Sequence, residues 1–223
     1  IDHPRHLAFV PAAPTRASIL FDLVTAASSI HGAFWLEGAG GIYCENEAME
    51  WLGSLTGLPK GAFGVFTSGG TAANLSAMVT AREHWRINPK NLNKKGIMVT
   101  SSGAHSSVKS MAKVIDAEVL LVPTETAMTA ADIEKAVSQL TPEAQERVFA
   151  VVATGGTTNA GIIDDLAGVA TYCENHHLWF HVDAAYGGGA MAAPSVRDLF
   201  IGIERADSIT IDPHKWLFSP YDC

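Results

Sequence analysis

The stretch Leu178-Trp179-Phe180-His181-Val182-Asp183-Ala184 is an apolar run that ends in one acidic residue. Two similar runs, VFAVVAT at 148–154 and SITI at 208–211, lie on either side of it in the chain. Because the run at 148–154 is continuously apolar up to its last residue, both faces of such a strand are expected to be covered. Such strands, alternating with helix-like segments, are typical of a mostly parallel sheet between helices. The pattern predicts an α/β fold whose ligand site lies beyond the carboxyl ends of the strands.

The rest of the chain divides into a helical first part and an alternating second part. The first part predicts a helix around Ile19–Val24, shortly after Pro14, and another over Glu45–Leu55, with GAGG at 38–41 between them. From residue 61, the expected strands are Ala62–Thr67, Ile97–Thr100, Glu118–Pro123, Arg147–Thr154, Leu178–Ala184 and Ser208–Ile211. The expected helices are Ala72–Trp85, Ser106–Val114, Ala130–Leu140 and Asp164–Asn175, the third preceded by a capping box of Thr129 and Asp132. We therefore expect an N-terminal helical segment at 1–59 and a larger α/β domain at 60–223.

Composition narrows the function classes. The 223 residues are 48% hydrophobic and 17% charged, with a net charge of −8 and no basic run, so neither nucleic acid nor an anionic membrane is an expected partner. Cys44, Cys173 and Cys223 are scattered, which favours the reducing cytoplasm, and the nine histidines show no metal-ligand spacing. The sequence begins without methionine or a signal peptide, and we expect it to be part of a longer enzyme.

Thr67-Ser68-Gly69-Gly70-Thr71 lies between an expected strand and an expected helix. Glycines permit a tight turn that exposes backbone N–H groups at a helix N-terminus, where the helix dipole favours an anion. Gly70 and Thr71 are therefore candidates for binding a phosphate. A simple glycine-containing turn is the alternative.

Asp183 and Lys215 are the two candidates for chemistry at strand ends. A carboxylate at the end of an apolar strand is costly unless it meets a cation or hydrogen-bond donors, and a protonated ring nitrogen is one such partner. Lys215, in Asp212-Pro213-His214-Lys215-Trp216, follows the strand 208–211, and a lysine amine can attack a carbonyl to give a Schiff base. The alternatives are an aspartate that caps the next turn and a surface lysine.

Two more polar segments follow strands. His105, in the segment 101–107, is a candidate for stacking on a flat ring or for proton transfer, or else a hydrogen-bonded structural histidine. The segment 154–158 offers hydroxyl groups, Thr158 among them.

Four motifs together resemble one enzyme family. SGGTAANL (68–75), AHSSVK (104–109), HVDAAYGG (181–188) and DPHKW (212–216) occur in the order and spacing of the group II pyridoxal-phosphate-dependent amino-acid decarboxylases. Asp183 and Lys215 are 32 residues apart, and the resemblance also takes in HPRHLAFVP (3–11) and PYDC (220–223). It implies a fold type I, aspartate aminotransferase-like large domain, with the small C-terminal domain outside this sequence.

The resemblance implies roles for the cofactor pyridoxal phosphate (PLP). Lys215 would form the Schiff base, Asp183 would pair with the pyridine nitrogen, and His105 and Ala185 would lie against the two ring faces. The other implied cofactor contacts are Gly70, Thr71, Thr158, Asp212 and His214. Asp212 stands where many relatives have an asparagine that contacts the phosphate, and an additional anion there would repel it.

The implied reaction is decarboxylation of an L-amino acid to an amine and CO2, by a cytoplasmic homodimer. Phe9, Val10, Pro11 and Ala12 match a substrate-pocket segment, in which Ala12 replaces a polar residue of the aromatic-amino-acid decarboxylases. An aldehyde lyase, an aminotransferase and a non-catalytic fragment that needs its missing C-terminal part remain as alternatives. A second polypeptide carrying that part is a further possible partner.

Overall fold

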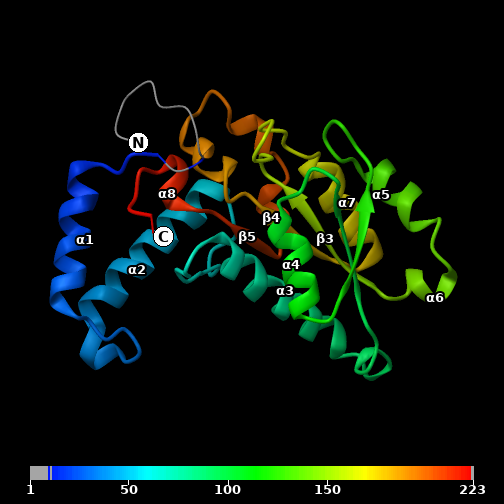
Figure 1. Cartoon of the computed structure of the whole chain (residues 1–223), viewed down its shortest axis with the longest axis horizontal. Coiled ribbons are helices and arrows are strands. Elements are labelled where there is room, and N and C mark those ends of the chain that lie inside the picture. The colour runs from blue at the N-terminus through cyan, green and yellow to red at the C-terminus, as the bar shows by residue number, and fades with distance from the viewer. Residues whose placement is uncertain (1–9, 11, 222–223) are drawn as a thin grey trace.

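The computed structural model describes residue 10 and residues 12–221. A parallel sheet of five strands lies between the helices (Figure 1). The strand order is β2-β1-β3-β4-β5, and every neighbouring pair is parallel. The strands are β1 (Ile97–Ser101), β2 (Glu118–Val122), β3 (Val148–Thr154), β4 (Trp179–Asp183) and β5 (Ser208–Thr210). The α/β fold expected from the apolar runs is confirmed.

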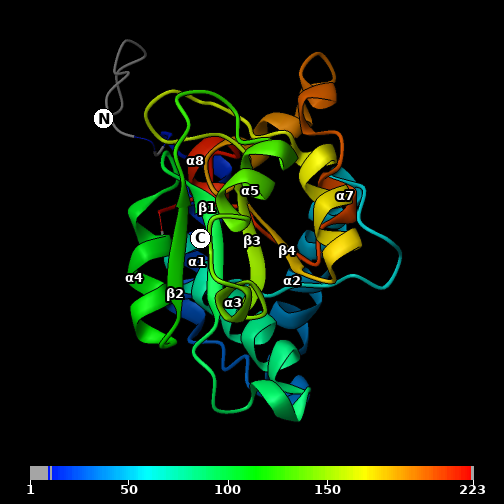
Figure 2. The ribbon, with the colours of Figure 1, turned by 90° about the vertical axis from the view of Figure 1, so that its right-hand side faces the viewer.

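Helices cover both faces of this sheet. The α-helices are α1 (Arg16–Ser28), α2 (Trp35–Thr56), α3 (Gly70–Arg86), α4 (Ser106–Val114), α5 (Ala130–Val137), α6 (Pro142–Gln145), α7 (Leu166–His176) and α8 (Pro213–Trp216). Short 3-10 helices are η1 (Pro89–Asn91), η2 (Gly187–Ala192), η3 (Arg197–Phe200) and η4 (Ile203–Arg205). Apolar side chains of α3 and α4 pack on one face and those of α5 and α7 on the other, with the sheet between them (Figure 2).

The central strand β3 shows why the runs do not alternate. All seven of its residues are buried, because Val151 and Ala153 face the α7 side while Phe149 and Val152 face the α3 side. A strand that is covered on both faces buries all of its side chains, so its residues are almost all apolar. Its first polar side chain appears at its carboxyl end, in Thr154.

The expected strand Ala62–Thr67 is wrong. Residues 62–67 have no strand structure, and the Phe66 N–H donates to the Glu45 side chain at 2.9 Å rather than to another strand. A strand exists only where a neighbour supplies backbone partners, and in the described part of the chain no strand pairs with this segment.

The start of α2 and the end of α5 also differ from the sequence-based expectation. GAGG does not separate two helices, because α2 begins at Trp35 and continues through it with a kink at Gly38 (φ −118°, ψ 19°). A Cβ on Gly38 would lie 2.7 Å from the His31 carbonyl oxygen, so the kink accommodates a close approach that only glycine permits. α5 ends at Val137 rather than at residue 140, and Pro142 then starts α6.

The expected starts of two helices are confirmed. α1 contains the Ile19–Val24 run, and Thr15 caps it by accepting from the Ser18 N–H at 3.1 Å. The capping box before α5 is present, with Thr129 and Asp132 bonding each other's backbone. The division of the chain at residues 59 and 60 stays a prediction.

Candidate active site

A cavity of about 290 Å³ lies at the carboxyl edge of the sheet, where the loops after the parallel strands meet the start of α3. Its volume is close to the lower end of the ~300–1,000 Å³ range of small-molecule sites. The residues that line it are Ser68, Gly69, Gly70, Thr71, Asn74, His105, Ser107, Thr154, Gly156, Thr158, Asp183, Ala185, Tyr186, Asp212, His214, Lys215 and Tyr221. Five segments far apart in the sequence thus share one site.

The structure brings together every residue that the resemblance assigned to the cofactor. Gly70, Thr71, His105, Thr158, Asp183, Ala185, Asp212, His214 and Lys215 all line this one cavity. The proposed substrate segment is only partly described, because Phe9 and Pro11 lie outside the described residues. Ala12 is close to the site, since its N–H donates to the His214 carbonyl at 3.2 Å, and Val10 lies in a bend just before it.

Lys215 reaches the cavity from α8, a single helical turn that Pro213 starts. Its ammonium nitrogen lies 2.8 Å from Asp212 Oδ2, and the side chain is 19% exposed. Trp216 packs edge-on against Tyr186 with ring centroids 4.9 Å apart, which fixes the turn against η2. The amine is therefore held by a carboxylate inside a cleft rather than lying free on the surface.

Asp212 is the buried acidic residue beside the glycine turn. Only 6% exposed, it presents its carboxylate to Gly70, where a Cβ would lie 2.7 Å from Oδ1. Any larger side chain than glycine at position 70 would collide with this carboxylate. The start of α3 and the Lys215 turn are therefore in direct contact.

The N-terminus of α3 offers an anion site. Gly69 precedes the helix with φ +84°, a conformation that favours glycine, and Gly70 and Thr71 form its first turn. The first-turn N–H groups of a helix lack intrahelical partners and carry the positive end of its dipole. Backbone donors and the Thr71 side chain thus line the cavity where a phosphate would be stabilised.

Asp183 ends β4 and is buried, 6% exposed, with hydrogen-bond donors on both carboxylate oxygens. Asn74 Nδ2 donates to Oδ2 at 2.9 Å, and the Ala185 N–H donates to Oδ1 at 3.2 Å. A carboxylate oxygen can accept more than one hydrogen bond, so capacity remains for a donor in the cavity. The bond from the Ala185 N–H also caps the turn after β4, so the capping and the cofactor readings of Asp183 are compatible.

His105 is the N-cap of α4, and its ring is fixed by the helix that it caps. Nδ1 accepts from the Ser107 N–H at 3.2 Å and lies 2.8 Å from the Ser107 hydroxyl. Since a backbone N–H only donates, Nδ1 must be the unprotonated nitrogen in this arrangement. The structural and the functional readings of His105 are compatible, because the capped ring lines the cavity.

Asn74 was not singled out from the sequence as a site residue, and Thr154 was included only as part of the hydroxyl-bearing segment 154–158. Asn74, 1% exposed, projects from α3 between Asp183 and His181, and Thr154 closes β3 with a buried hydroxyl. Two features of the sequence could have indicated the role of Asn74. It is a polar residue four positions after Gly70 in the expected helix, and His181 and Asp183 are two polar residues on one face of the expected strand. Residues two apart share one face of a strand, so both side chains point towards α3.

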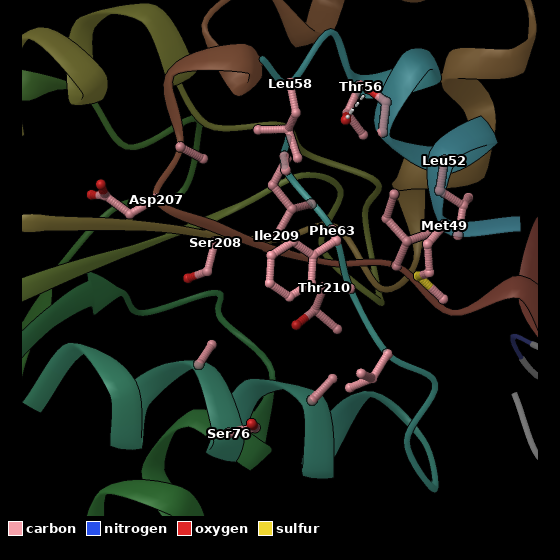
Figure 3. A pocket seen from close by; sticks show the side chains of 18 of the residues that line it. Met49, Leu52, Thr56, Leu58, Phe63, Ser76, Asp207, Ser208, Ile209 and Thr210 are labelled. Atoms are coloured by element: carbon pink, nitrogen blue, oxygen red, sulfur yellow. Dashed lines mark hydrogen bonds between the residues drawn. The ribbon is translucent and has the colours of Figure 1, made fainter. Parts of the chain in front are cut away.

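A second, larger cavity of about 550 Å³ lies between α2, residues 61–67, α3 and β5. Figure 3 shows its lining, with Met49 and Leu52 from α2, Phe63 from the extended segment and Ile209 from β5. It shares only Gly69 and Asp212 with the smaller cavity. Because its lining contains neither a lysine nor a histidine and is mostly apolar, we assign the chemistry to the smaller cavity.

The donors and acceptors of the smaller cavity fit pyridoxal phosphate. The α3 N-terminus suits a phosphate, Lys215 suits an aldehyde and Asp183 suits a protonated ring nitrogen. Thr154 Oγ1 is buried and has no hydrogen-bond partner among the described residues, which leaves it available to a ligand. In the described part of the chain, His, Cys, Asp and Glu do not gather in groups of three, as most metal sites require.

Comparison with known proteins agrees with this site. The sequence is 34% identical to the aromatic-L-amino-acid decarboxylase of Bacillus atrophaeus, covering 100% of this chain and 46% of the relative. It is 32% identical to the L-2,4-diaminobutyrate decarboxylase of Acinetobacter baumannii, covering 100% of this chain and 48% of the relative. The chain thus spans about half the length of these relatives.

A solved structure shows the same fold. The glutamate decarboxylase domain of a diaminobutyrate-pyruvate transaminase and L-2,4-diaminobutyrate decarboxylase from Vibrio parahaemolyticus superposes with a TM-score of 0.89 at 29% identity. The match covers 99% of this chain and 50% of that one. Residues 1–223 also match the family described as the pyridoxal-dependent decarboxylase conserved domain. The chain therefore belongs to the family of pyridoxal-dependent decarboxylases.

Proposed function

We propose that this chain is the cofactor-binding portion of an enzyme that decarboxylates an L-amino acid, and that Lys215 holds the cofactor. The observation that carries the proposal is the meeting of Lys215, Asp183 and the α3 N-terminus in one cavity. An amine, a buried carboxylate and an anion site are the groups that the aldehyde, the ring nitrogen and the phosphate of PLP need. The family membership of the whole chain supports the same reading.

Each residue has a task in this proposal. The Lys215 amine would bond to the cofactor aldehyde. Asp183 would hold a proton on the ring nitrogen, and His105 and Ala185 would bracket the ring. Gly70 and Thr71 would bind the phosphate, with Thr158 and His214 beside them. Lys215 must leave Asp212, 2.8 Å away, before its amine is free to bond.

Bound pyridoxal phosphate supplies an electron-withdrawing ring that takes up the electrons left when a substrate carboxylate departs as CO2. The protein sets the charge of the ring through Asp183, which is buried and therefore interacts strongly with any cation beside it. It also orients the substrate, since the bond that breaks depends on the pose. Val10 and Ala12 belong to the segment beside His214 that we propose for this orientation, together with Phe9 and Pro11.

The identity of the amino acid is a separate question. The relatives named above act on aromatic amino acids and on L-2,4-diaminobutyrate, two chemically different side chains. Family membership therefore supports the reaction class rather than one substrate. The small Ala12 at the edge of the site favours a substrate side chain that needs no polar partner there.

We also propose that the enzyme is a cytoplasmic homodimer. The apolar side chains of α1 support an interface, because the helix has no buried residue in this chain. Sedimentation of the intact enzyme should give twice the mass of one polypeptide. Mass spectrometry of the same sample would show whether a second polypeptide accompanies this one.

Among the described residues, none of the helices has the length and hydropathy needed to cross a membrane.

The test is a panel of amino acids incubated with the intact enzyme and PLP. We expect release of CO2 and the matching amine, and a visible absorbance of bound cofactor that Lys215→Ala abolishes. Lys113→Ala, an exposed lysine on α4, is the matched control and should keep both signals. Release of a keto acid would identify an aminotransferase and release of an aldehyde a lyase, whereas a colourless preparation would contradict cofactor binding.

A further inference from the structure

A line of buried and half-buried polar side chains runs behind the cavity, along one face of β4 from its first residue to Asp183 at its end. It contains Trp179, Ser208, His181, Asn74 and Asp183, which come from β4, β5 and α3. Asn74 and His181 are 1% and 0% exposed. Buried polar groups in an apolar layer are costly, so a chain that satisfies all of them needs an explanation.

The direction of every hydrogen bond in this chain follows from its Asp183 end. Asn74 lies 2.9 Å from Asp183 Oδ2, and an ionised carboxylate only accepts, so the amide nitrogen must face it. The amide oxygen then faces His181 Nε2 at 3.0 Å. Because this oxygen only accepts, Nε2 carries the proton of the imidazole.

The other half of the chain follows in the same way. A neutral imidazole with its proton on Nε2 accepts at Nδ1, which lies 2.8 Å from the Ser208 hydroxyl. Ser208 therefore donates to His181, and its oxygen accepts from the Trp179 indole N–H at 2.8 Å. All donors point the same way, from the indole towards the carboxylate.

Burial is consistent with the neutral imidazole. Desolvation lowers the pKa of His181 to about 4, against the opposing attraction of Asp183. At neutral pH the ring therefore carries one proton, as the hydrogen-bond directions require. A charged His181 would donate from both nitrogens and break the order at Ser208.

We propose that Asn74 and His181 are positioning residues that aim the Asp183 carboxylate at the cofactor ring nitrogen and keep the proton on that nitrogen. The inference rests on the proposed function of Asp183. Asn74 fixes one oxygen from behind, and the Ala185 N–H fixes the other. A donor to a carboxylate stabilises its charged form, so the proton shared with the ring stays on the ring nitrogen.

The test uses the intact enzyme loaded with PLP labelled with nitrogen-15 in the ring. Its nitrogen resonance distinguishes a protonated from a neutral pyridine without any turnover. We expect the protonated position in the wild type and a shift towards the neutral position in Asn74→Leu, which keeps the branched shape of the side chain and removes both hydrogen bonds. The dissociation constant of PLP should rise about tenfold, as for loss of a hydrogen bond to a charged group.

A cofactor analogue with carbon in place of the ring nitrogen distinguishes two effects of Asn74→Leu. One is the loss of Asp183 orientation towards the ring nitrogen, and the other is a general distortion of the site. If Asn74 acts through the ring nitrogen, wild type and Asn74→Leu should bind this analogue equally. Equal weakening for PLP and the analogue, or no change for either, would overturn the proposal. Thr100→Val removes a buried hydroxyl bond to the Val152 carbonyl (2.8 Å) away from the cavity and should leave both affinities unchanged.

Two further variants keep the outcome decisive. If Asn74→Leu does not fold, His181→Phe removes the partner that orients the Asn74 amide and should give the same selective loss in smaller measure. Asp183→Asn tests the proposed function itself. If Asp183→Asn leaves the nitrogen resonance unchanged, the role of Asp183 fails; if it shifts the resonance while Asn74→Leu and His181→Phe do not, only the positioning proposal fails.

Discussion

At the scale of single residues, Asp212 is the side chain that the sequence marked as unusual and the structure places at the centre of the site. Its buried carboxylate contacts Gly70 at the start of α3 and pairs with Lys215. The same carboxylate thus faces the proposed phosphate position and holds the amine that must react. Both effects oppose cofactor binding, the first by repulsion and the second by retaining the cation.

Asp212→Asn should therefore strengthen cofactor binding. Two like charges ~5 Å apart repel by about 3 kcal/mol at an effective dielectric constant of 20, and solvent and nearby donors offset part of this. We expect the dissociation constant of PLP to fall about tenfold, measured by titration of the visible absorbance. Asp198→Asn, an exposed acidic residue, is the control, and weaker binding by Asp212→Asn would mean that the carboxylate helps to hold the cofactor.

Thr154 allows a sharper comparison, because its buried hydroxyl has no partner among the described residues. Thr154→Val keeps the shape and removes a group that costs about 1–3 kcal/mol when buried without a hydrogen bond. We expect the ligand-free protein to be as stable as the wild type or more stable, and PLP to bind several times more weakly. Chemical denaturation and cofactor titration measure the two effects.

Thr100→Val is the matched substitution for this prediction. The Thr100 hydroxyl donates to the Val152 carbonyl, so its loss should cost about 1 kcal/mol of stability and leave PLP affinity unchanged. If Thr154→Val lost stability in the same way, its hydroxyl would have a partner in solution and no role reserved for a ligand.

The site residues that sequence analysis identified share one property. Lys215, Asp183, His105 and Gly70 stand in short polar segments after apolar runs, where type and position both indicate chemistry. Asn74 lies one turn into α3, beyond the polar segment that starts the helix, and its role depends on which strand faces that helix. Only the packing of α3 against β4 reveals that Asn74 meets both Asp183 and His181.

At the scale of elements, the parallel strands were predictable and the extended segment 62–67 was not. A fully buried parallel strand such as β3 can be recognised in the sequence by its uninterrupted apolar run. The run at 62–67 has similar composition, but strand formation depends on a neighbour that composition does not encode. The helix through GAGG is a similar case, since the kink at Gly38 is fixed by the close approach of His31.

Asp164 joins three elements near the site. Its carboxylate accepts from the Thr154 N–H at 2.7 Å and from the Met128 N–H at 2.8 Å, which ties the end of β3 to the segment before α5. The next residue, Asp165, caps α7. Burial raises the pKa of Asp164 to about 6, because desolvation outweighs the two backbone donors.

This raised pKa predicts how stability depends on pH. Between the usual value of 3.8 and about 6, the folded protein binds the Asp164 proton while the unfolded chain releases it. The free energy of unfolding should therefore decrease by about 2 kcal/mol as the pH rises from 4 to 6, and by about 3 kcal/mol over the whole titration, levelling off above about pH 7.

Asp164→Asn isolates this contribution, because an amide does not titrate. The difference in free energy of unfolding between variant and wild type, measured by denaturation at each pH, should change across the pH 4–6 window. A constant difference over this window would mean that Asp164 keeps its ordinary pKa in the folded protein.

At the scale of the whole molecule, the apolar surface is unevenly distributed. The apolar side chains Ile19, Leu20, Phe21, Leu23 and Val24 of α1 are 51–72% exposed, and Phe63 beside the larger cavity is 92% exposed. The α/β core between β3 and the helices is by contrast fully covered. Contiguous exposed apolar patches on soluble proteins usually mark interaction surfaces.

The chain of 223 residues, prepared alone, should consequently expose these surfaces and self-associate. We expect strong binding of a hydrophobic dye and sedimentation as mixed oligomers. Apolar surface that is removed from water on association stabilises the oligomer by about 25 cal/mol per Å². The paired substitution Leu20→Ser with Phe21→Ser should reduce both signals, while Asp22→Ser on the same helix should not. If α1 forms the proposed dimer interface, the intact enzyme should bind little dye. A chain that sediments as a dye-free monomer would contradict this expectation and would place the dimer contacts of the enzyme away from α1.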